Sequence, residues 1–145
     1  MIRKTAVPAT LAACLDLFLK LWPGLREGTL VPGVLEVRRV TNTGAAFGLL
    51  PGAPWALGVL GAAAIALLAL YLRGDPPRGF MAAGFALLLG GAAGNLLDRL
   101  LHGFVHDWLM FSFVRFPVFN LADAFLTAGA ALLAFGLLRP GAEAA

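Results

Sequence analysis

The sequence predicts an all-α membrane protein with four transmembrane helices and a small β-rich segment outside the membrane. Of its 145 residues 60% are hydrophobic and only 13% are charged, and the mean hydropathy is +0.86, well above that of soluble domains. Four segments approach the roughly 20 apolar residues that cross a bilayer. A fifth stretch, between the first two, has β-branched residues between turn residues. No internal repeat or second domain is evident, so we expect residues 1–145 to form a single integral membrane domain.

The four expected helices cover residues 6–22, 54–72, 80–97 and 122–138. The first and last are short and carry Asp16, Lys20 and Asp123, so hydropathy alone marks them as weak spans. The link 73–79 contains consecutive prolines, through which neither neighbouring helix can continue. The second and third helices should therefore form an antiparallel pair.

Two longer connections should lie on one side of the membrane, opposite the short link and both termini. Residues 23–50 include VLEVRRV between glycines and prolines, which predicts a small sheet or hairpin at the membrane surface. Residues 101–117 are rich in aromatic side chains suited to the interface, namely Trp108, Phe111, Phe113 and Phe116. Five basic residues fall on each side, so charge counting does not orient the chain.

Charge and cysteine content exclude several classes of function. The net charge of +3 comes from basic residues in loops and ends rather than from one stripe, which argues against nucleic-acid binding and favours anionic lipid headgroups as counterions. A single cysteine, Cys14, excludes an internal disulfide and a cysteine-rich metal site. Residues 11–14 also resemble the box at which bacterial lipoproteins are lipidated and cut, but only residues 5–10 separate this box from Lys4, fewer than the roughly 7 to 15 apolar residues of a signal-peptide core.

Two aspartates stand where an apolar protein tolerates carboxylates least. Asp107 lies in GFVHDWL, and Asp123 lies in FPVFNLAD directly before a long apolar run. Ionisable groups at membrane depth are costly and usually mark function. Two carboxylates in one cleft of low dielectric cannot both ionise easily, so one keeps a proton while the other acts as a base on water. This is the chemistry of peptide hydrolysis by an aspartic dyad.

Other polar residues recur at helical spacing. Asn95 and Arg99 are four residues apart, as are Asp16 and Lys20, and Asn120 lies three residues before Asp123, so each pair shares one helix face. Such groups also pair simply to hold membrane helices together. That reading suits Asp16 with Lys20, and it suits Asp98 with its neighbour Arg99 and the surface.

Five sequence blocks resemble the successive motifs of lipoprotein signal peptidase, also called signal peptidase II. They are TNTGAAFG at 41–48, GGAAGNLLDR at 90–99, GFVHDW at 103–108 and FPVFNLAD at 116–123, preceded by Asp16 and Lys20 of the first helix. The resemblance implies an intramembrane aspartic endopeptidase of the bacterial inner membrane. Such enzymes remove signal peptides from diacylglyceryl-modified prolipoproteins by cutting before the lipidated cysteine.

The resemblance also assigns residues. The family's catalytic aspartates fall on Asp107 and Asp123, and it implies cytoplasmic termini with the active site and the β-rich segment toward the outer face. We expect no cofactor and no metal, a monomer, and membrane lipids and lipidated prolipoproteins as partners. The positions implied to surround the dyad or touch substrate are Asp16, Lys20, Asn42, Gly44, Asn95, Arg99, Asn120 and Ala122.

Two features depart from the family pattern. The first block reads DLFLK and lacks the polar residues that often stand between its Asp and Lys, which puts secondary contacts of that helix in doubt. His106 stands directly before Asp107, where an aliphatic residue is usual. The sequence does not decide whether His106 raises or lowers the proton affinity of Asp107. For the oxyanion of the reaction, Asn95, Asn120 and the backbone near Gly44 are candidate donors.

Three rival functions remain at this stage. His102 and His106 are four residues apart and suggest a zinc protease, but no HExxH pattern or third ligand is evident. A small ion- or proton-coupled carrier would also use acids at membrane depth, although four helices without paired halves suit alternating access poorly. A purely structural membrane protein would leave the two aspartates unexplained.

Overall fold

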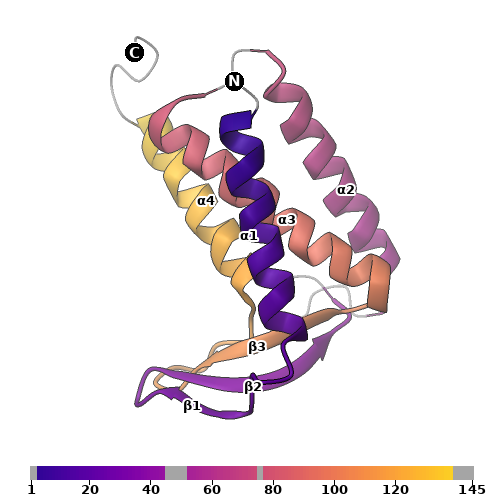
Figure 1. Ribbon diagram of the computed structural model, residues 1–145, viewed down its shortest axis with the longest axis vertical. Coiled ribbons are helices and arrows are strands. Elements are labelled where there is room, and N and C mark those ends of the chain that lie inside the picture. Colours follow the sequence, from indigo (N-terminus) through magenta and orange to yellow (C-terminus); the bar gives the residue numbers. More distant parts are fainter. Residues whose placement is uncertain (1–2, 45–51, 75–76, 139–145) are drawn as a thin grey trace.

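The computed structural model describes residues 3–44, 52–74 and 77–138, as four helices beside a small sheet (Figure 1). The helices are α1 (Arg3–Leu21), α2 (Pro54–Tyr71), α3 (Gly79–His102) and α4 (Leu121–Leu138), and the strands are β1 (Gly28–Val31), β2 (Leu35–Asn42) and β3 (Val105–Phe111). The start of α1, the end of α2, the start of α3 and the end of α4 lie at one end of the bundle, and the sheet lies at the other. The described parts of the two long connections thus share one end of the bundle, as predicted, and their side of the membrane stays a prediction.

Three of the helices, α2, α3 and α4, are long and apolar enough to cross a membrane. This confirms a multi-pass membrane protein. The predicted first span, α1, is not among them, because it carries Asp16 and Lys20 besides basic residues at its start. It nevertheless lies lengthwise against α3 (Figure 1). Four transmembrane helices therefore remain our proposal, with α1 held by its neighbours rather than by its own hydropathy.

Helix α3 is the centre of the bundle and packs against each of the other three helices. Its glycines permit the close approach on two faces. A Cβ atom on Gly90 would lie 2.6 Å from the Cβ of Ala12 in α1, and one on Gly91 would lie 2.5 Å from the carbonyl oxygen of Ala122 in α4. Small residues are the usual device for helix contact in lipid, where no hydrophobic force drives the helices together.

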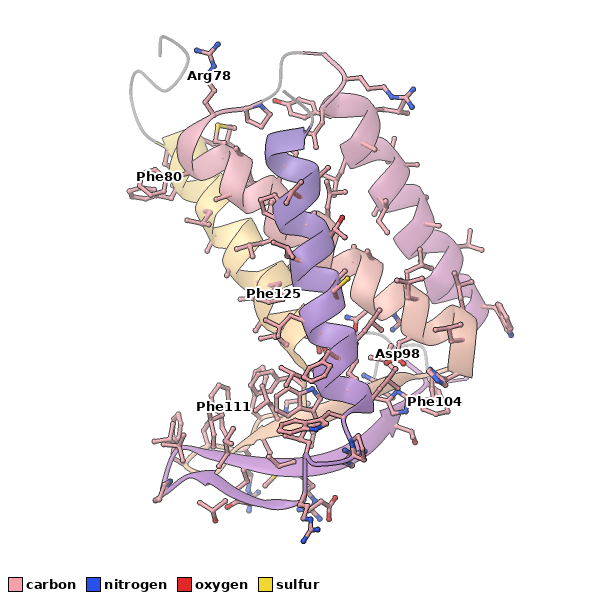
Figure 2. The ribbon with its side chains drawn as sticks, in the orientation of Figure 1. Arg78, Phe80, Asp98, Phe104, Phe111 and Phe125 are labelled. Carbon is pink, nitrogen blue, oxygen red and sulfur yellow. The ribbon has the colours of Figure 1, made fainter. Side chains whose placement is uncertain are left out.

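The sheet is antiparallel with strand order β1-β2-β3, and it closes the end of the bundle. Val37, Trp108 and Leu109 form its buried apolar core, against which Leu19 from α1 and Leu121 from α4 pack. This contact fixes where the helix ends stand relative to the strands. Figure 2 shows Phe111 and Phe104 near the sheet, and Arg78 and Phe80 at the opposite end of the bundle.

The sequence interpretation missed β3. Residues 101–117 were expected to form an aromatic interfacial connection, but 101–102 complete α3 and Val105–Phe111 pair with β2, with Val40 opposite Asp107. Trp108 is 6% exposed and belongs to the core, whereas Phe113 is 67% exposed and suits the interface as predicted. Strand pairing across more than sixty residues of chain decided this, and local composition does not reveal it.

Candidate functional site

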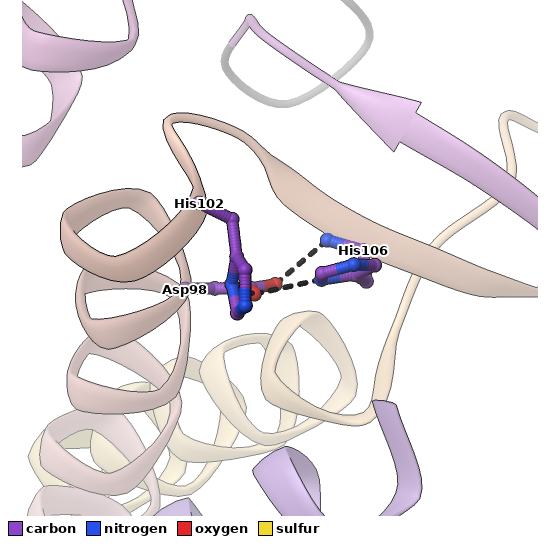
Figure 3. Close-up of side chains that lie close together, drawn as sticks. All are labelled: Asp98, His102 and His106. Carbon is purple, nitrogen blue, oxygen red and sulfur yellow. Dashed lines mark hydrogen bonds and ion pairs between the residues drawn. The ribbon is translucent and has the colours of Figure 1, made fainter. Parts of the chain in front are cut away.

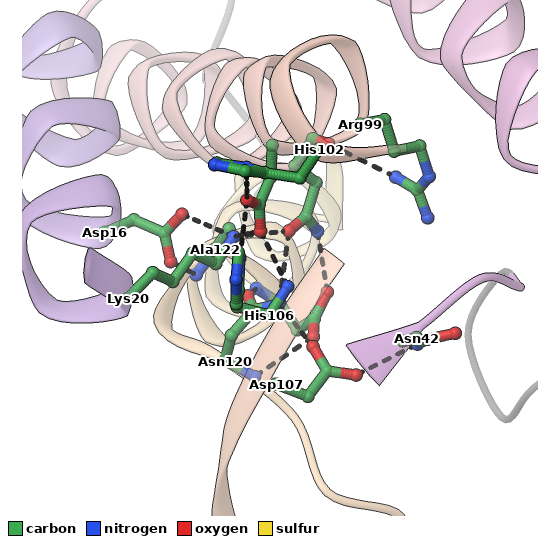
Figure 4. Close-up of polar contacts among 12 residues, drawn as sticks. Asp16, Lys20, Asn42, Arg99, His102, His106, Asp107, Asn120 and Ala122 are labelled. Carbon is green, nitrogen blue, oxygen red and sulfur yellow. Dashed lines mark hydrogen bonds and ion pairs between the residues drawn. The ribbon is translucent and has the colours of Figure 1, made fainter. Parts of the chain in front are cut away.

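The candidate active site forms where the C-terminal ends of α1 and α3 and the N-terminal end of α4 meet the edge of the sheet (Figure 4). Each element contributes a polar side chain to one connected network. The predicted residues that it joins are Asp16 and Lys20 from α1, Asn42 from β2, Asn95 and Arg99 from α3, Asp107 from β3, Asn120 and Ala122 beside or within α4, Asp123 from α4, and Gly44 after β2.

Asn120 and Asp123 begin helix α4 with a reciprocal capping arrangement. The backbone N–H of Asp123 donates to Oδ1 of Asn120 at 2.9 Å, and the backbone N–H of Asn120 donates to Oδ2 of Asp123 at 3.2 Å. This geometry satisfies two N–H groups that a helix start otherwise leaves unpaired. The first turn of a helix also favours negative charge. Asp123 is therefore held rigidly at a place suited to a carboxylate.

Asp107 reaches the same network from β3. Its Oδ1 accepts from Nδ2 of Asn120 at 2.6 Å, and its Oδ2 accepts from Nδ2 of Asn42 at 2.9 Å. The side chain is buried, with 3% of the residue exposed. Burial raises the pKa of Asp107 to about 6; the negative charge of Asp123 adds to the rise, and the amide hydrogen bonds oppose it. A carboxyl with this pKa is half protonated near pH 6.

Asn95 connects the aspartate pair to a buried ion pair. Its Nδ2 donates to Oδ1 of Asp123 at 2.9 Å, and its Oδ1 accepts from Nζ of Lys20 at 2.9 Å and from Nδ2 of Asn120 at 3.1 Å. Lys20 in turn lies 2.7 Å from Oδ2 of Asp16, which confirms the predicted pairing, and both side chains are fully buried. Asn95 thus has its orientation fixed from three sides.

Asp16 also anchors the start of α4, since its Oδ1 accepts from the backbone N–H of Ala122 at 2.8 Å. The absence of a side chain on Gly94 makes room for Asp16, because a Cβ there would lie 2.5 Å from Oδ2. Ala122 contributes through its backbone alone and is completely buried. These contacts give α1 a positional role at the site.

Arg99 and Gly44 hold the end of β2 close to α3. Nη2 of Arg99 donates to the carbonyl oxygen of Gly44 at 2.9 Å, and the N–H of Gly44 donates to Oδ1 of Asn42 at 2.9 Å. The rest of the predicted motif, residues 45–48, lies outside the described residues. The groups expected to serve as oxyanion donors, Asn95, Asn120 and Gly44, all donate within the network already. In the structure, Asn95 and Asn120 donate hydrogen bonds to the two aspartates, and Gly44 donates one to Asn42.

A cavity of about 810 Å³ opens beside the two aspartates, between α2, α3 and α4. Asp107 and Asp123 both line it, so the pair predicted from sequence shares one space. Asn42, Asn95 and Arg99 complete its polar end. Away from the sheet the wall is apolar, with lining residues Leu57, Gly61, Ala64, Leu96, Leu126, Ala128 and Ala131. Polar groups at one end and an apolar groove beyond them suit a ligand that is partly polar and partly apolar.

The structure corrects the interpretation of Asp98 and shows where the side chain of His106 lies. Asp98 does not pair with Arg99 at the surface; it is fully buried, and its Oδ2 lies 3.5 Å from Nζ of Lys20. His106 does not contact Asp107, because neighbouring residues of a strand point to opposite faces. Its Nδ1 lies 2.7 Å from Oδ1 of Asp98 instead.

Asp98 also lies beside both histidines, where the sequence interpretation found no third potential ligand. His102 lies one helical turn after Asp98, with Nδ1 3.0 Å from Oδ1 of Asp98 (Figure 3). The spacing of four residues predicts the contact between Asp98 and His102. The contact with His106 could not be predicted from spacing, because it depends on the turn at Gly103. The positive φ of Gly103, 79°, ends α3 and directs β3 back past the last turn of that helix.

Comparison with known proteins places this geometry in context. The family described as signal peptidase (SPase) II matches residues 9–139. A lipoprotein signal peptidase of Cyanothece sp. is 40% identical over 130 residues, which cover 83% of this chain and 75% of the relative. One from Gloeobacter violaceus is 40% identical over 138 residues, which cover 90% of this chain and 79% of the relative.

Solved structures show the same likeness. A bacterial membrane enzyme determined by the in meso method at 2.3 Å resolution is 28% identical, with a TM-score of 0.87 over 95% of this chain and 89% of its own. A second bacterial membrane enzyme, determined in the same way at 1.9 Å, is 28% identical, with a TM-score of 0.83 over 96% of this chain and 95% of its own. The similarity therefore extends over nearly the whole fold.

Proposed function

Because the chain belongs to the signal peptidase II family of aspartic peptidases, we propose that it removes signal peptides from diacylglyceryl-modified bacterial prolipoproteins, cutting before the lipidated cysteine. The observation that carries this proposal is the convergence of Asp107 and Asp123 on one cavity whose far wall is apolar. A carrier is not favoured, since the family is enzymatic and the polar groups of the site are tied to one another.

We assign the two acids different roles. Asp107, whose pKa is raised to about 6, polarises the scissile carbonyl in its protonated form. Asp123, in the first turn of α4 and bonded to Asn95, is the carboxylate that takes a proton from the attacking water. Water adds to the carbonyl carbon to give a tetrahedral intermediate, the C–N bond breaks, and the proton passes to the leaving amine. No covalent enzyme adduct forms.

Asn95, Asn120 and Asn42 are positioning residues in this scheme. Each donates a side-chain N–H to one of the two carboxylates at 2.6–2.9 Å. With those donors fixed, the carboxylates need little rearrangement as charge moves between them, and such preorganisation is a large part of enzymatic rate enhancement. Lys20 does not line the large cavity, and its Nζ orients Asn95 by donating a hydrogen bond to Oδ1 of that residue.

The apolar part of the cavity is the proposed site for the lipid. Acyl chains lie in the bilayer already and can enter sideways between α2 and α4, which both pack on α3. Partition of the lipidated precursor into the bilayer, at about 0.8 kcal/mol for each CH₂ group that leaves water, brings its chains to the level of this groove. The groove therefore selects lipid-modified precursors over unmodified ones.

We further propose that α1 is the fourth transmembrane helix, that the protein acts as a monomer in the inner membrane, and that its termini are cytoplasmic. The sheet and the site then face the outer side. The sheet end of the bundle carries exposed apolar side chains, with Phe113 67% and Val114 50% exposed, which suits contact with the membrane surface. Accessibility labelling of single cysteines in β1 and in the α2–α3 link tests the orientation.

The proposal is tested by replacing each acid in turn. Asp107→Asn and Asp123→Asn should each abolish cleavage of a purified diacylglyceryl prolipoprotein. The control Glu27→Gln changes an exposed acid directly before β1 and should leave the cleavage activity unchanged. An unlipidated precursor of the same sequence should be cut poorly by the wild type. Substantial turnover by either Asp→Asn variant, with folding preserved, would overturn the assignment.

A further inference from the structure

We propose that Asp98, His102 and His106 form a binding site for a divalent transition-metal ion of the zinc class, separate from the aspartate pair. The three residues come from the last turn of α3 and from β3, and one ligand atom from each lies within 4.8 Å of the others. Two imidazoles with one carboxylate are a donor set that zinc binds readily. Figure 3 shows both rings turned toward the carboxylate.

The present contacts are close to those of a metal site. Nδ1 of His102 and Nδ1 of His106 lie 3.0 and 2.7 Å from the same atom, Oδ1 of Asp98. Zinc bonds of 2.0–2.2 Å at tetrahedral angles separate ligand atoms by about 3.3 Å. Each of the two nitrogens is therefore within about 0.6 Å of the separation from Oδ1 that a shared zinc ion requires. Each neutral imidazole carries its proton on Nε2 in the metal-bound form, which frees Nδ1 to bind.

The carboxylate is already oriented for this role. Its other oxygen, Oδ2, accepts from the backbone N–H of His106 at 2.7 Å and lies 3.5 Å from Nζ of Lys20. Outer partners of this kind hold metal ligands in place. The ammonium group of Lys20 is a nearby positive charge and lowers the affinity below that of an isolated carboxylate with two imidazoles.

Access and coordination number also fit. Asp98 has no exposed side-chain surface, whereas the side chains of His102 and His106 are 32% and 28% exposed. An ion can reach the cluster from the histidine side, and a water molecule can fill a fourth position there. Three protein ligands and one water are typical of open zinc sites.

The site is distinct from the proposed hydrolytic centre. Asp107 lines the large cavity with Asp123, but His106, the preceding residue, points away from that cavity and onto α3. A metal held by His106 therefore does not activate the water that Asp123 would use. Removal of the metal with a chelator should leave cleavage of a lipidated precursor unchanged.

Isothermal titration of chelator-treated protein with Zn²⁺ tests the proposal. The protein must carry no histidine tag, because His102 and His106 are the two histidines of the sequence. We expect one Zn²⁺ per chain in the wild type and in the matched control Cys14→Ser, which removes an exposed thiol elsewhere. His102→Ala and His106→Gln should each weaken binding at least tenfold.

A second measurement guards against misfolding. Saturating Zn²⁺ should raise the melting temperature of the wild type and of Cys14→Ser, because a ligand of the native state stabilises it. His102→Ala should melt like the metal-free wild type and should not respond to Zn²⁺. Absence of Zn²⁺ binding by the wild type, or binding that His102→Ala retains at wild-type affinity, would overturn the proposal.

Discussion

Asn120 links the stability of α4 to the chemistry of the site, and two substitutions separate these roles. Its Oδ1 caps α4 by accepting from the N–H of Asp123, while its Nδ2 donates to Asp107 and to Asn95. Serine is as good an N-cap as asparagine, whereas alanine is not. Asn120→Ser therefore keeps the cap and removes both amide donations, and Asn120→Ala removes all three interactions.

The expected magnitudes follow from these contacts. The hydrogen bond to Asp107 is worth about 1.5–3 kcal/mol where that carboxyl gives up its proton and carries charge in the transition state, so its loss lowers kcat/KM about 10- to 150-fold. Both variants should show this loss. Asn120→Ala should in addition be less stable than Asn120→Ser by about 1 kcal/mol, the usual value of an N-cap.

The pH profile gives an independent readout. The bond from Asn120 lowers the pKa of Asp107, so its removal should move that pKa above about 6 in both variants. The assay is cleavage of a lipidated precursor across pH 4–8 in detergent or nanodiscs, with thermal unfolding recorded alongside. Wild-type activity in Asn120→Ser, or equal stability of the two variants, would refute the division of roles.

Two further predictions concern the buried charges. The folded pKa of Asp107 is raised from 3.8 to about 6, so the contribution of this group to stability is full below pH 3.8 and is lost as pH rises through 6. The fall in melting temperature between pH 4 and 7 should therefore be smaller in Asp107→Asn than in the wild type, and an equal fall would contradict the pKa. Lys20→Met should cost about 3–5 kcal/mol, because it leaves the carboxylates of Asp16 and Asp98 buried without their cation. Adding Asp16→Asn should recover part of that loss in thermal unfolding, and a single variant as stable as the wild type would show that the ion pair contributes nothing.

The sequence was sufficient to predict the helices and to single out the two acids. Apolar runs of bilayer length predicted α2 and α4 to within one residue at each end and α3 except for its last five residues, since a helix in lipid satisfies its own backbone hydrogen bonds and needs no distant partner. Helical spacing also paired Asp16 with Lys20 correctly. The resemblance of ordered motifs gave the family, which the comparisons confirm.

Tertiary structure alone decided how those groups meet. Strand β3 pairs with β2, which lies more than sixty residues earlier in the chain. That pairing places Asp107 at the cavity and places His106, on the opposite face of the strand, beside Asp98. Asp98 is buried where α1 brings Lys20 and β3 brings His106 to it, and neither contact follows from the local sequence. Local patterns predict elements whose hydrogen bonds are local, whereas strand register and buried charge pairing depend on contacts between distant segments, which only the folded chain establishes.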